Sequence, residues 1–253
     1  MIVRFSHNNQ QYKADLSKPL DISLPLNHGA GNPNCYWAEP VRFETIRSGN
    51  FVGSVLEGGS VNYQKLIITP HGNGTHTECY GHISSEANAT INRSLKHFHF
   101  IAQLISVLPE RTGSEDSIIT LHQVKAKINH TNIQAVVLRT LPNNDTKRTQ
   151  QYSGTNPPYI DPALTQYFAS VGVDHLLVDL PSLDREVDHG QLLAHKAFWN
   201  LEGTIRKGCS VTELIFVDNS IPDGLYLLNL QIASLEMDAS PSKPVLYKLE
   251  EVL

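Results

Sequence analysis

Residues 69–83 read TPHGNGTHTECYGHI, and twelve of these positions span four side chains that can bind a metal or carry a proton: His71, His76, Glu78 and His82. The β-branched and aromatic residues at 63–69 predict a strand that ends before Pro70. If extended geometry continues to Glu78, His76 and Glu78 share a face, because strand side chains alternate. An imidazole beside a carboxylate suits a divalent metal ion. Each histidine taken singly could be structural, but four such groups between glycines predict a site.

Part of this stretch resembles the signature of the cyclase-type metal-dependent hydrolases, a family that includes kynurenine formamidase. That signature runs His-x-Gly-Thr-His-x-Asp-x-Pro-x-His, and four residues match it in place: Gly74, Thr75, His76 and His82. Glu78 stands where the family has Asp, and Tyr80 stands where it has Pro. The first family His falls on Gly72, so that His71 comes one residue too early.

The departures from the signature have physical consequences. Glutamate in place of aspartate keeps the charge but adds a methylene, which moves the carboxylate. His71 lies five residues before His76, so in a regular strand it faces the other way. A bulge at residues 72–74 would reverse this parity, because a bulge inserts one unpaired residue. We hypothesise that His71 is recovered as a metal ligand through such a bulge.

Two downstream residues resemble the rest of the family's metal site. His195 precedes a bulky aromatic pair, as the family's downstream ligand precedes large apolar residues, although His189 fits nearly as well. Glu213 is the only acid in the apolar run at 212–217, where a carboxylate must be paired, protonated or metal-bound. The resemblance implies that a glutamate on such a strand completes the site.

The expected metal ligands are therefore His71, His76, Glu78, His195 and Glu213. Imidazoles and carboxylates suit one or two Zn²⁺ or Mn²⁺ ions, and ligand type alone does not separate these metals. A catalytic metal keeps an open position for water. His82 is the expected catalytic group, carrying a proton to the leaving nitrogen.

The resemblance also implies a reaction, the hydrolysis of a C–N bond in a small formamide, amide or cyclic amide by metal-activated water. Tyr36 and Trp37, in a long loop at 25–40, and Tyr80 would suit an aromatic or flat carbonyl substrate. Alternatively, Tyr36 and Trp37 simply close one end of the core. The alternative function is a metal-stabilised small-molecule binding protein whose degenerate site has lost turnover.

Composition limits the classes of partner. The 253 residues are 40% hydrophobic and 18% charged, with a net charge of −5, so no basic footprint for nucleic acid or an anionic membrane exists. Three widely spaced cysteines argue against a disulfide framework. The sequence has no long apolar run and no leader-like start, so we expect a cytoplasmic protein.

We expect one α/β domain spanning residues 1–253. No composition shift or linker divides the chain. The resemblance implies a swivelling β/β/α type of fold, with a central mixed sheet or barrel-like β core flanked by helices, in a homodimer or homotetramer. Strands are predicted at 2–16 as a hairpin and at 97–100, 135–140, 173–180, 212–217, 224–233 and 245–249. Helices are predicted at 120–128, 161–172 and 189–199. The breaker-rich segment 142–160 is predicted to be a lid or binding loop.

Overall fold

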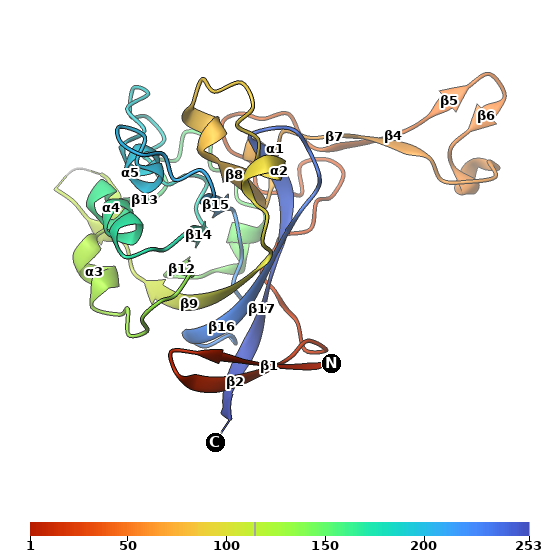
Figure 1. Ribbon diagram of the computed structural model, residues 1–253. Helices are drawn as coiled ribbons and strands as arrows, with labels where there is room; N and C mark the ends of the chain where they lie inside the picture. Colours follow the sequence, from red (N-terminus) through yellow and green to blue (C-terminus); the bar gives the residue numbers. More distant parts are fainter. Residues whose placement is uncertain (114, 253) are drawn as a thin grey trace.

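A computed structural model describes residues 1–113 and 115–252. Seven strands close into a mixed barrel (Figure 1). In order around the barrel they are β17 (Ala239–Val252), β16 (Gly224–Ile232), β9 (His99–Val107), β12 (Ala135–Thr140), β14 (His175–Val178), β15 (Ser210–Glu213) and β8 (His76–Cys79). Strand β8 then pairs with β17 and completes the ring. The predicted α/β fold with a barrel-like β core is confirmed.

The parallel part of the barrel consists of β9, β12, β14 and β15. Every residue of β12 and β14 is buried, as expected for parallel strands covered on both faces. Helices α3 (Leu121–Lys125), α4 (Pro162–Ser170) and α5 (Leu193–Trp199) gather on one side of the barrel (Figure 1). Their largest side chains, Phe168 and Trp199, are fully buried. Each such side chain contributes about 1.5–3 kcal/mol through burial.

The two ends of the chain meet on β17. The predicted N-terminal hairpin is present as β1 (Ile2–His7) and β2 (Gln10–Asp15), and β2 pairs with the end of β17. The short strand β3 (Leu20–Asp21) pairs with β17 nearer its middle. Strand β17 therefore holds the hairpin, β3, β16 and β8 together.

Residues 42–67 form an arm that projects away from the barrel (Figure 1). Its stem pairs β4 (Arg42–Thr45) with β7 (Gln64–Ile67), and its outer part pairs β5 (Arg47–Ser48) with β6 (Phe51–Val52), followed by η1 (Val55–Glu57). The predicted strand at 63–69 is present as β7, and it lies on this exposed arm. Leu66 is 53% exposed, because β propensity does not determine which surface a strand packs on.

Short elements connect the barrel strands. They are α1 (Pro70–Asn73), η2 (Tyr80–Ile83), α2 (Ile91–Ser94), η3 (Asp145–Arg148), and a small sheet of β10 (Glu110–Arg111), β11 (Ser117–Ile119) and β13 (Tyr159–Ile160). The predicted loop at 142–160 therefore contains a 3₁₀ turn and ends in a strand. The helix expected from residue 189 starts only at Leu193, because His189 and Leu192 have positive φ angles of 59° and 49°. No helix in the described part of the chain is long and apolar enough to cross a membrane.

Candidate metal centre

Strand register brings three of the expected ligands together at one end of the barrel. β8 and β15 are antiparallel, and His76 lies directly opposite Glu213. Glu78, two residues along β8 from His76, faces the same side because strand side chains alternate. His195 reaches the cluster from α5. All four side chains are at most 3% exposed.

Ligand-type atoms converge within this cluster, and only some of them form hydrogen bonds with one another. His195 Nε2 lies 3.1 Å from Glu78 Oε1 and 3.6 Å from Glu213 Oε1. His76 Nε2 lies 3.2 Å from Glu213 Oε2. Yet among the described residues His76 Nε2, Glu78 Oε2 and Glu213 Oε1 are buried without a hydrogen-bond partner. Buried charged groups whose oxygens lack hydrogen-bond partners are costly. A divalent cation in their midst would satisfy these atoms, so the residues present fit a metal ion.

Each buried histidine is oriented by a bond to its other ring nitrogen. His76 Nδ1 lies 2.9 Å from the carbonyl oxygen of Gly74, and His195 Nδ1 lies 2.5 Å from Asp184 Oδ2. Asp184 also accepts the backbone N–H groups of Ala194 and His195. Such partners fix the tautomer and aim Nε2 at a metal. Asp184 was not identified from the sequence as a site residue.

Burial and hydrogen bonding have opposite effects on the pKa values of Asp184 and His195. Burial favours the neutral form of Asp184, but the hydrogen bonds from His195 and the backbone outweigh burial and lower the pKa of this carboxyl. Burial likewise opposes a charge on His195, but Asp184, Glu213 and Glu78 together raise its pKa well above the usual value. A proton on His195 therefore compensates the carboxylates when no cation does so.

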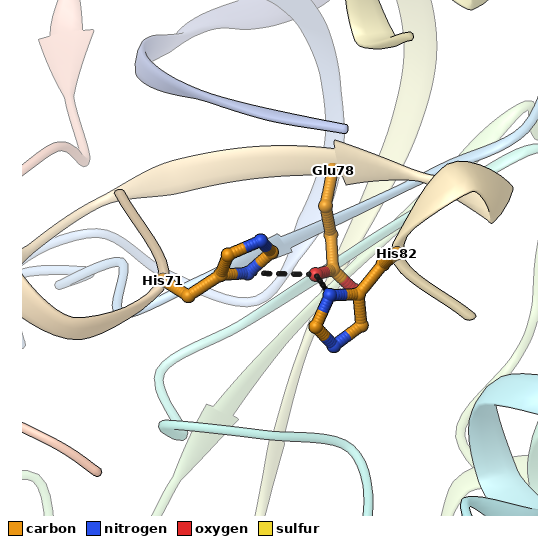
Figure 2. Close-up of side chains that lie close together, drawn as sticks. All are labelled: His71, Glu78 and His82. Atoms are coloured by element: carbon orange, nitrogen blue, oxygen red, sulfur yellow. Dashed lines mark ion pairs between the residues drawn. The ribbon is translucent and has the colours of Figure 1, made fainter. Parts of the chain in front are cut away.

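His71 and His82 approach the outer side of Glu78 (Figure 2). His71 Nδ1 lies 3.1 Å and His82 Nδ1 lies 3.7 Å from Glu78 Oε2. Asp238, the residue before β17, lies 2.8 Å from His71 Nε2 and 3.3 Å from His82 Nδ1. Hydrogen bonds from the two histidines, His71 first, lower the pKa of Asp238. Burial opposes a charge on His71, but Asp238 and Glu78 raise its pKa to about 10.

The hypothesis of a bulge at 72–74 was wrong, although His71 does point toward Glu78. One helical turn, α1, occupies residues 70–73 and redirects the chain before β8. Gly72 packs so closely that an added Cβ would lie 2.3 Å from Ala38 Cβ. No side chain fits at position 72 in this backbone, so the imidazole is supplied from the neighbouring position instead.

The remaining candidates lie at different distances from the cluster. A cavity of about 250 Å³ opens onto it, lined by His71, His82, Glu213, Tyr36, Ser182 and Arg185 among others. Tyr36 thus lies where a substrate wall was expected. Trp37 is 73% exposed and does not line this cavity. Tyr80 packs instead under the Lys207 ammonium group, 5.5 Å from its ring centre. Of the two downstream candidates, His189 is exposed. His195 lies in the cluster, 3.1 Å from Glu78.

Known proteins resemble this chain over most of its length. The model of the family described as "Putative cyclase" matches residues 14–185, about two thirds of the chain. This chain belongs to that family. The match includes the residues of the 69–83 motif and Asp184, whereas His195 and Glu213 lie beyond it.

Full-length similarity extends past the family match. The kynurenine formamidase of Geobacillus thermodenitrificans (strain NG80-2) is 29% identical over 240 residues, covering 93% of this cyclase-family chain and 97% of that enzyme. Two solved structures share the fold. A "predicted metal-dependent hydrolase" from Bacillus stearothermophilus has a TM-score of 0.65 at 17% identity, covering 91% of this chain and 98% of that one. Isatin hydrolase A from Ralstonia solanacearum has a TM-score of 0.66 at 12% identity, covering 92% and 91%. Together they support a cyclase-family hydrolase.

Proposed function

We propose that this cyclase-family chain hydrolyses the C–N bond of a small formamide, amide or cyclic amide, with a divalent ion held by His76, Glu78, His195 and Glu213. The observation that carries the proposal is that His76, Glu78 and Glu213 hold buried atoms without hydrogen-bond partners and bring ligand atoms within 4.8 Å of one another. His195 lies beside them, with Nε2 3.1 Å from Glu78 Oε1. The similarity to kynurenine formamidase supports the substrate class. Zn²⁺ and Mn²⁺ both suit this donor set.

A second ion is compatible with the same geometry. Two groups of potential ligands share Glu78: one contains His76 and Glu213, and the other contains His71 and His82. We propose His71 as a ligand of the outer position. The two oxygens of Glu78 face different partners: Oε1 lies 3.1 Å from His195 Nε2, and Oε2 lies 3.1 Å from His71 Nδ1.

A bound ion would polarise the substrate carbonyl and lower the pKa of a coordinated water toward neutrality. The chain's own residues handle the proton. His82 lines the cavity, and its Nδ1 is oriented by Asp238, so that Nε2 is left without a partner in the described structure. During hydrolysis the water oxygen bonds to the carbonyl carbon, the C–N bond breaks, and we propose that His82 delivers the proton to the leaving nitrogen. Such a group contributes ~10²–10⁴-fold in rate.

The test combines metal content with turnover. Elemental analysis of wild-type protein purified without chelator should find bound metal that His76→Ala loses. Assays should use N-formyl aromatic amines and cyclic amides with added Zn²⁺ or Mn²⁺. The exposed His122, on α3 far from the motif, provides a matched control as His122→Ala. Metal bound without turnover of any such substrate would leave the binding-protein alternative. No metal in the wild type, even after addition, would refute both.

We also propose that a second copy of this chain is the protein's partner. The arm exposes apolar side chains, with Leu56 97% and Val55 54% exposed. It carries both signs of charge, as in the Arg47–Glu57 pair, which suits a self-complementary contact. Light scattering should give an oligomer for the wild type and a monomer for Leu56→Asp. A monomeric wild type would refute the proposal.

A further inference from the structure

A second cavity lies at the end of the barrel opposite the metal centre. It measures about 700 Å³ and is lined at the N-terminal ends of β9, β14 and β15, by residues that include Phe100, His175 and Cys209. Glu213 lies at the other end of β15, four residues from Cys209, a separation of about 13 Å along a strand. The metal centre therefore does not account for this cavity.

The floor of the cavity is apolar and aromatic, with one polar atom left open. Phe100 and His175 are 5% and 4% exposed, and their ring centres lie 3.9 Å apart. His175 Nδ1 lies 2.8 Å from Ser210 Oγ. Its Nε2 has no hydrogen-bond partner among the described residues, and this atom is not fully buried. Nε2 is thus the accessible polar atom of a buried ring that lines the cavity.

The protonation state of His175 suits a hydrogen bond to a ligand and not an ion pair within the protein. Burial, followed by the nearby Arg206 cation, lowers the pKa of His175 to about 3. The ring is therefore neutral at physiological pH. When the Ser210 hydroxyl donates to Nδ1, Nε2 carries the hydrogen and can donate into the cavity.

The rim is basic in a protein whose net charge is −5. Lys96, Arg206 and Lys207 line the cavity together with a single acid, Asp174. Arg206 is bound to Asp174, at 3.1 Å, and to backbone carbonyls. The Lys96 ammonium group contacts only the carbonyl oxygen of Asn92 among the described residues, at 2.9 Å. Lys207 is paired with Glu86, at 2.8 Å, so among the described residues Lys96 is the lining cation that no carboxylate pairs, and its charge attracts anions.

A second donor stands beside the buried ring. Gln134 accepts the backbone N–H of Ile101 through Oε1, at 3.1 Å. Its Nε2 has no partner in the described part of the chain and belongs to a residue that lines the cavity. Two neutral donors above an aromatic floor, next to an ammonium group on the rim, match a flat ring that carries one carboxylate.

We propose that this cavity binds a small aromatic carboxylate, with its ring over Phe100 and its carboxylate toward Lys96, Gln134 and His175 Nε2. The site is separate from the metal centre and does not depend on the function proposed for that centre.

The probe is benzoate, and its binding is measured by titration calorimetry and ligand-observed NMR. Benzyl alcohol has the ring without the charge, and acetate has the charge without the ring. We expect saturable benzoate binding that weakens with salt, and weaker binding of both comparison compounds. Lys96→Glu should raise the Kd by about fivefold, the size of a strong exposed charge contact. The matched control Lys18→Glu makes the same charge change on an exposed turn and should leave the Kd unchanged.

Benzoate could also bind a metal through its carboxylate, so the titration is repeated on His76→Ala. Retained binding in His76→Ala, together with weaker binding in Lys96→Glu and in His175→Phe, supports the far cavity. Binding that disappears in His76→Ala but keeps its wild-type Kd in Lys96→Glu would overturn the proposal. Absence of saturable binding, or equal affinity for benzyl alcohol, would overturn it as well. Because Lys96 is exposed, Lys96→Glu remains informative even if His175→Phe does not fold.

Discussion

Replacing Asp184 by asparagine tests whether Asp184 orients His195, the proposed metal ligand, while leaving His195 itself unchanged. Asp184 accepts three hydrogen bonds: from His195 Nδ1 at 2.5 Å, from the Ala194 amide at 2.7 Å and from the His195 amide at 3.2 Å. Asparagine keeps one acceptor oxygen and turns an NH₂ group toward one of these donors. All three bonds end on an ionised carboxylate, and hydrogen bonds to charged groups contribute about 1.5–3 kcal/mol each.

That loss corresponds to a reduction of about 10–100-fold in metal affinity, the usual effect of removing such a partner. Competition with a chromophoric chelator measures the affinity of wild type and Asp184→Asn directly. Circular dichroism and thermal unfolding check that the variant folds.

Asp188 provides the matched control. It accepts the backbone N–H groups of Gly190 and Leu192, at 2.8 and 2.6 Å, in the turn before α5. Asp188→Asn therefore perturbs the same turn without touching His195. If Asp184→Asn bound metal within twofold of the wild type, or if Asp188→Asn weakened it equally, the orienting role of Asp184 would be refuted.

Three further outcomes follow from the site. His82→Ala should lower turnover by ~10²–10⁴-fold while elemental analysis finds normal metal content; equal loss of both would make His82 a ligand. Because the folded pKa of His71 is raised to about 10, its contribution to the stability of chelator-treated protein is full below pH ~6.5 and is lost as the pH rises through 10. The melting temperature of metal-free wild type should therefore fall more steeply over this window than that of His71→Gln, and parallel curves would contradict the assignment. Gly72→Ala should destabilise the fold by about 1–3 kcal/mol through overpacking against Ala38, measured by urea unfolding, and Ala38→Gly should recover part of this loss in the double variant.

Local periodicity was enough to predict that His76 and Glu78 face the same side of their strand. Both residues lie in a short regular strand, where alternation alone determines which side chains share a face. Glu213 was likewise recognisable as an isolated acid in an apolar run. These features depend on neighbouring residues only, so the sequence carries them directly.

The two orienting carboxylates could not be predicted in the same way. Asp238 meets His71 across 167 residues of chain, and nothing in its small-residue surroundings marks it. The role of Asp184 depends on where α5 begins, because Asp184 accepts the amides of Ala194 and His195. The arm shows the same limit, since the pattern at 63–69 predicted a strand but not its solvent exposure.

The closure of the barrel by β17 has a consequence for how the chain matures on the ribosome. β17 supplies the pairing partner of β2, β3 and β8, and the residue just before it is Asp238. The pairings of the motif strand β8 and of the hairpin strand β2 with β17 therefore cannot form until β17 has been synthesised. Contacts between such distant segments form slowly. The candidate ligands on β8, α5 and β15 are therefore all synthesised before the strand that closes the barrel beside them, and their final arrangement forms only after that strand has been made.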